Sequence, residues 1–112
     1  MVSTDESATI AVDVQHDAGA ALVTIVGELE FGTAASLRTT LSDLAQQGCD
    51  PIVLDLAALS FIDSTGLSLL VQAKQRFTSQ GRRFELRAPT LRVTRVIETS
   101  GLAELFALEG DR

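Results

Sequence analysis

A nearly continuous apolar segment, Ile52-Val53-Leu54-Asp55-Leu56, constrains the fold more than any other part of the chain. It follows a chain-breaking Asp50-Pro51 pair. Apolar residues at successive positions are typical of a strand covered on both faces, as strands of parallel sheets are. We therefore expect an inner strand here, with packed layers on both sides.

The segments before this strand predict a hairpin and a helix. Ile10, Val12 and Val14 alternate with less apolar residues, which indicates a half-buried strand. After a turn at 15–19, residues 21–27 predict a second strand, and 27–32 a loop. Thr33 is a suitable N-cap for an amphipathic helix that ends near Gly48.

Helix and strand patterns alternate after the apolar segment. They predict a helix over 64–80, a strand over 84–88, a helix from 89–90 to about 101, and at 105–108 a last short strand or a packed tail. Such alternation implies right-handed crossovers. We therefore expect a single α/β domain with a mostly parallel sheet of four to five strands, an antiparallel first strand and packed helices. It should span 9–108, between a flexible tail at 1–8 and a charged end at 109–112.

The composition excludes several classes of protein. With 112 residues, of which 46% are hydrophobic, the chain suits one domain with a real core. The net charge of −6 argues against a nucleic-acid partner. The charge is uneven: residues 1–63 sum to −9 and residues 64–112 to +3. Solvated surface charge explains this most simply, although the Arg-rich second half would also suit an acidic partner.

The cysteine count and the N-terminus suggest where the protein works. Cys49 is the only cysteine and has no CxxC partner, so we interpret it as structural and expect a reducing compartment. The polar, acidic start of the chain lacks the features of a signal peptide. No apolar run approaches the roughly 20 residues of a membrane span. We expect a cytoplasmic protein without a membrane partner.

The segment Phe61-Ile62-Asp63-Ser64-Thr65-Gly66-Leu67 joins the most buried strand to the most apolar helix. Asp63 or Ser64 is the natural N-cap, Gly66 would let another molecule approach the backbone, and Leu67 would anchor the helix. A phosphate on Ser64 would meet free N–H groups and the positive end of the helix dipole. Ordinary helix capping explains the same residues, and on chemistry alone it is the commoner explanation.

Two enzymatic interpretations fit the sequence poorly. A nucleophile elbow reads G-x-S-x-G, but the segment around Ser64 lacks the first glycine. The only histidine, His16, lies in an early turn, and Asp55 reads as a hydrogen-bonded structural acid. Neither a P-loop nor G-x-G-x-x-G occurs. We expect no catalytic residue, no cofactor and no metal.

Three stretches resemble the STAS family, named for sulfate transporters and anti-sigma factor antagonists. They are Gly27-Glu28-Leu29, then residues 52–56 running into 61–67, and Ser100-Gly101-Leu102. The likeness covers about residues 10–108. The family's first loop commonly reads Gly-Glu-Leu-Asp, whereas this chain has Glu30 in the last place, a longer acid that caps and turns less well than Asp.

The resemblance implies a partner-switching role. The unmodified antagonist would bind an anti-sigma factor that is also a serine kinase, and so release the sigma factor. The kinase would phosphorylate Ser64, with Thr65 the weaker candidate, and a serine phosphatase would reset the switch. The implied docking residues are Gly27, Glu28, Glu30, Asp63, Ser64, Thr65, Gly66 and Leu67. The alternative is a non-switching scaffold subunit of a lipid-transport or stress-signalling complex.

Overall fold

The computed structural model describes residues 8–108, so the predictions for 1–7 and for 109–112 lie outside the described residues. This part of the chain contains four strands and three helices: a hairpin of two strands comes first, and helices and strands alternate after it. They are β1 (Ile10–Asp17), β2 (Ala20–Leu29), α1 (Ala34–Gln47), β3 (Ile52–Ile62), α2 (Ser64–Ser79), β4 (Phe84–Arg87) and α3 (Leu91–Thr99).

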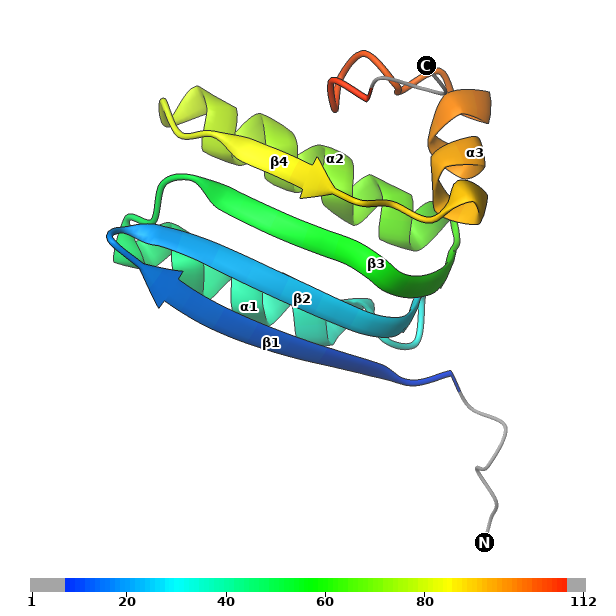
Figure 1. Cartoon of the computed structure of the whole chain (residues 1–112), viewed down its shortest axis with the longest axis horizontal. Helices are drawn as coiled ribbons and strands as arrows, with labels where there is room; N and C mark the ends of the chain where they lie inside the picture. Colours follow the sequence, from blue (N-terminus) through cyan, green and yellow to red (C-terminus); the bar gives the residue numbers. More distant parts are fainter. Residues whose placement is uncertain (1–7, 109–112) are drawn as a thin grey trace, which may run out of the picture.

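The strands form one sheet in the order β1-β2-β3-β4 (Figure 1). β1 pairs antiparallel with β2, and the β2–β3 and β3–β4 pairs are parallel, as the sequence predicts. Residues 105–108 form no strand. They lie in a turn that buries Phe106, so the packed tail is the correct alternative.

The prediction that β3 is covered on both faces is wrong. Figure 1 shows α1 and α2 side by side behind the sheet, and Ile52, Leu54 and Leu56 are fully buried on that face. Val53 and Asp55 point to the opposite face and are only half-buried. Burial therefore alternates along residues 52–56, as in a strand with one covered face. On the open face, neighbouring side chains give partial cover, and the Arg87 guanidinium pairs with the Asp55 carboxylate at 3.1 Å.

Both inner strands are longer than the sequence predicts, and the extra length positions the site. β2 continues through Leu29 and β3 through Ile62, with register shifts between Thr24 and Val26 and between Gly27 and Glu28. A bulge breaks the two-residue alternation that identifies a strand in a sequence. In β3 the buried residues change from every second position to every third, and this brings Phe61 to the surface.

Candidate functional site

Asp63 ties the start of α2 to the loop between β2 and α1. Its Oδ1 accepts a hydrogen bond from the Gly66 N–H at 2.9 Å, and its Oδ2 accepts one from the Phe31 N–H at 3.1 Å. The Asp63 N–H donates to the Leu29 carbonyl oxygen at 3.2 Å. Asp63 is thus the N-cap, and it joins two segments that lie 32 residues apart.

Ser64 is the first residue of α2 and is exposed, whereas Thr65 is half-buried. No hydrogen bond joins the Ser64 hydroxyl to another residue within 8–108, so this oxygen is open to an approaching enzyme. The rigid cap beside it holds the helix start in place. Ser64 therefore has the better access of the two hydroxyls.

Gly66 is buried, and the atoms that approach its backbone belong to this chain. A Cβ at this position would lie 2.6 Å from the Leu29 carbonyl oxygen and 2.8 Å from the Leu29 Cγ. The interpretation that Gly66 leaves room for another molecule is therefore wrong, because β2 fills that space. Leu67 is likewise buried, as expected of an anchor.

The end of β2, just before the β2–α1 loop, is held by hydrogen bonds to neighbouring segments. Gly27 has a φ of 115°, and a Cβ there would collide with the Thr9 carbonyl oxygen, so this position of β2 requires glycine. The Glu28 N–H donates to that same oxygen at 2.9 Å. Ser60 of β3 donates to the Gly27 carbonyl oxygen at 3.0 Å.

Thr33 stands at the N-cap position of α1 but does not cap it with its side chain, contrary to the prediction. Its buried hydroxyl instead donates to the Glu28 carbonyl oxygen at 2.7 Å and accepts from the Glu30 N–H at 3.0 Å. The Glu30 carboxylate accepts from the Gly32 N–H. The longer acid therefore still closes this loop.

Two exposed phenylalanines beside Ser64 were missed by the sequence reasoning. Phe31 is 81% exposed although its N–H is bound by Asp63, and Phe61 is 39% exposed two residues before Asp63. In the sheet, Phe61 lies opposite Glu28. Each phenylalanine has a large apolar side chain on the surface near Asp63, and such side chains are candidates for an interaction site. The sequence signal for Phe31 was a large apolar residue in a predicted loop, between Glu30 and Gly32, where it could be exposed.

A shallow groove of about 380 Å³ runs along α2 from the Ser64 hydroxyl. Leu67 and Val71 of α2 line it, together with Leu102 from the segment after α3. Leu102 belongs to the third sequence stretch named above, and the fold brings this stretch to the first turns of α2.

His16, the only histidine of the chain, lies far from Ser64. His16 pairs with Ala21, which pairs with Ile52 at the start of β3, whereas Ser64 follows the other end of that strand. Ten residues of strand span about 33 Å, so the His16 imidazole is far from the Ser64 hydroxyl. Within residues 8–108 no three His, Cys, Asp or Glu side chains gather as metal ligands would.

Asp55 is a structural acid, as predicted. Hydrogen bonds from the Ala57 N–H at 3.0 Å and from the Arg87 guanidinium at 3.1 Å hold the pKa of Asp55 below its usual value. Ala57 belongs to β3, and Arg87 belongs to β4 at the edge of the sheet. The carboxylate is therefore satisfied where it lies and is not part of the Ser64 site.

The exposed serine, the capping aspartate and the glycine-requiring position in β2 are carried by a mixed four-stranded sheet. The sequence matches the STAS domain over residues 11–111. The chain belongs to the STAS domain family. No helix in 8–108 of this STAS domain is long and apolar enough to cross a membrane.

Relatives of this STAS domain include proteins named as anti-sigma factor antagonists. The anti-sigma-B factor antagonist of Bacillus subtilis is 33% identical over 97 residues, which cover 87% of this chain and 88% of the relative. The anti-sigma-F factor antagonist RsfB of Mycobacterium tuberculosis is 30% identical over 100 residues, covering 89% and 81%. A crystal structure of an anti-sigma factor antagonist from Mycobacterium paratuberculosis superposes with a TM-score of 0.80 at 26% identity, covering 94% of this chain and 87% of that one.

Proposed function

We propose that this STAS domain is an anti-sigma factor antagonist whose binding is switched off by phosphorylation of Ser64. The observation that carries the proposal is the exposed Ser64 hydroxyl at a capped helix start, beside the exposed Phe31 and Phe61 side chains. Relatives named as antagonists of anti-sigma factors support the same role. The domain acts by binding and not as an enzyme.

A phosphate on Ser64 would be tolerated by the fold but not by a docked partner. The start of α2 provides free N–H groups and a positive dipole for the anion. The added charge of about −1.5 to −2 would stand beside the Asp63 carboxylate. Against one acidic partner group about 6 Å away, dielectrics of roughly 20 to 80 give about 1–5 kcal/mol of repulsion. This corresponds to a loss of affinity from about fivefold to over a thousandfold.

The partner in this proposal is an anti-sigma factor that is also a serine kinase, and a serine phosphatase restores the binding form, all in the cytoplasm. The proposed docking face surrounds the Asp63 bridge, the pair of hydrogen bonds by which the Asp63 carboxylate joins the Gly66 N–H of α2 to the Phe31 N–H of the β2–α1 loop. The sequence-derived set is Gly27, Glu28, Glu30, Asp63, Ser64, Thr65, Gly66 and Leu67, to which the structure adds Phe31 and Phe61. Since Gly66 and Leu67 are buried, their part is to shape the backbone that the partner meets.

The test has a modification arm and a binding arm. The protein is incubated with ATP and candidate anti-sigma kinases, and mass spectrometry locates the phosphate, which we expect on Ser64 and not on Thr65. In the binding arm, calorimetry with the same kinases should show that Ser64→Ala retains the affinity. Ser64→Glu, with a single added charge, should lose affinity by about threefold to a hundredfold on the same estimate.

Ser79→Glu is the matched control, because it adds the same charge at the other end of α2 and should change the affinity less than twofold. If Ser64→Glu binds as tightly as the wild type, the switch is refuted. The non-switching scaffold, which also uses the STAS fold, then becomes the better explanation.

A further inference from the structure

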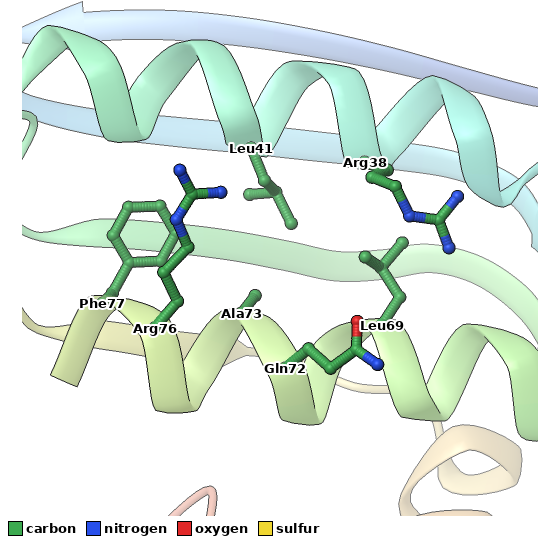
Figure 2. A pocket seen from close by; sticks show the side chains of 7 residues that line it. All are labelled: Arg38, Leu41, Leu69, Gln72, Ala73, Arg76 and Phe77. Atoms are coloured by element: carbon green, nitrogen blue, oxygen red, sulfur yellow. The ribbon is translucent and has the colours of Figure 1, made fainter. Parts of the chain in front are cut away.

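A second groove lies between α1 and α2, away from the loop that holds Phe31. Its volume is about 210 Å³. Figure 2 shows an apolar middle formed by Leu41 of α1 with Leu69 and Ala73 of α2. The guanidinium groups of Arg38 and Arg76 stand at its two ends.

Neither arginine is in an ion pair within the described residues. Arg38 is the only basic residue among the first 63, which include ten acids. Across residues 8–108, the ion pairs within 4.0 Å are Arg83–Asp50 and Arg87–Asp55, and neither includes Arg38 or Arg76. Arg82, in contrast, donates to the Ala45 carbonyl oxygen at 2.6 Å and packs over the Phe77 ring.

The volume of the groove decides which kind of ligand it suits. Pockets for small molecules and cofactors measure about 300–1,000 Å³, more than this groove offers. A space of about 210 Å³ is suited to one aliphatic side chain, and the two flanking cations are complementary to carboxylates on either side of it. We propose that the groove docks an acidic segment of a partner protein, with one leucine-sized side chain between two carboxylates that pair with Arg38 and Arg76.

No residue that lines this groove belongs to the docking face proposed around Ser64. Ser64 and Arg76 are twelve residues apart on α2, which corresponds to about 18 Å along the helix axis. The Debye length at physiological ionic strength is about 8 Å, so a charge on Ser64 is largely screened at Arg76. The inference can therefore fail while the proposed function holds, and the proposed function can fail while the inference holds.

The test uses a blocked, alanine-rich peptide with one central leucine and a glutamate four residues to either side. Titrated into ¹⁵N-labelled protein, it should shift the amides of Leu41, Leu69 and Ala73, and the affinity should fall as salt rises. The double variant Arg38→Gln/Arg76→Gln should weaken binding by about tenfold, as expected for two exposed ion pairs. Arg92→Gln/Arg95→Gln, on the exposed side of α3, removes the same charge and should weaken binding less than twofold.

Several results would overturn the inference. Absence of shifts, equal binding of a peptide with glutamine in place of both glutamates, or equal loss in the α3 variant would each exclude recognition by the two arginines. Octanoate that shifts these amides while the peptide does not would identify a small-molecule site. Shifts that depend on protein concentration would indicate a second copy of the chain. Loss of peptide binding in Ser64→Glu would refute independence from the switch.

Discussion

Replacing Gly66 with alanine places a methyl group between the start of α2 and the end of β2. The new Cβ would lie 2.6 Å from the Leu29 carbonyl oxygen, 2.8 Å from the Leu29 Cγ and 3.0 Å from the Ile62 Cγ1. Ordinary contacts at such a site are 3.4 Å or longer. One of the close atoms belongs to the backbone of a buried strand, so rotation of a side chain does not relieve the overlap.

The expected change in the free energy of unfolding is the difference between two opposing effects. Overpacking of a well-packed core destabilises by about 1–3 kcal/mol. Alanine favours a helix over glycine by up to about 1 kcal/mol, and this offsets part of the cost. We therefore expect Gly66→Ala to lower the free energy of unfolding by about 1–2 kcal/mol. With a urea m-value of about 1.5 kcal/mol/M, the midpoint of unfolding should fall by about 1 M.

Urea unfolding followed by circular dichroism measures this change, and Gly32→Ala is the matched control. Gly32 belongs to the same site, but its new Cβ would meet mainly the Glu30 Oε1 atom, the far end of a flexible, half-buried side chain that can move. The control should change the unfolding free energy by less than about 0.5 kcal/mol. A Gly66→Ala protein as stable as the wild type, or a control that loses as much, would refute the argument from close packing.

Three further predictions concern the same end of the fold and the open face of the sheet. Asp63→Ala removes both acceptors of the Asp63 bridge and should lower the free energy of unfolding by about 1–2 kcal/mol in urea titration, whereas Asp63→Asn, which keeps one acceptor, should lose less. Phe31→Ala should leave thermal stability unchanged, because the side chain is exposed, and weaken binding of an anti-sigma partner by at least tenfold in calorimetry; unchanged affinity would remove Phe31 from the docking face. The pKa of Asp55 is lowered in the fold, so its ionised form stabilises the protein above the ordinary pKa of about 4, and this contribution is lost as the pH falls through the folded value. Between about pH 5 and pH 2 the wild type should therefore lose stability more steeply than Asp55→Asn, and parallel curves would contradict the assignment.

Much of this fold follows from short-range patterns in the sequence. Alternation at Ile10, Val12 and Val14, heptad-like spacing of Leu37, Leu41 and Leu44, and Gly48 in a left-handed conformation identify the elements without any knowledge of their packing. Each pattern reflects a property of one element, namely its period or its end. The same local rules narrowed the cap of α2 to Asp63 or Ser64, and the structure identifies Asp63 as the cap.

The features that depend on contacts between distant segments did not follow from the sequence. Two bulges in β3 change the spacing of its buried residues and bring Phe61 to the surface, because the pairing of β3 with β2 determines where an extra residue is accommodated. The second bond of Asp63, to the Phe31 N–H, joins residues 32 positions apart. Local composition determined which elements form and that α2 begins at Asp63 or Ser64. Only the packing of β2 against α2 decided that Gly66 faces Leu29 and that Phe31 stands beside Ser64, because those distances exist only once the chain has folded.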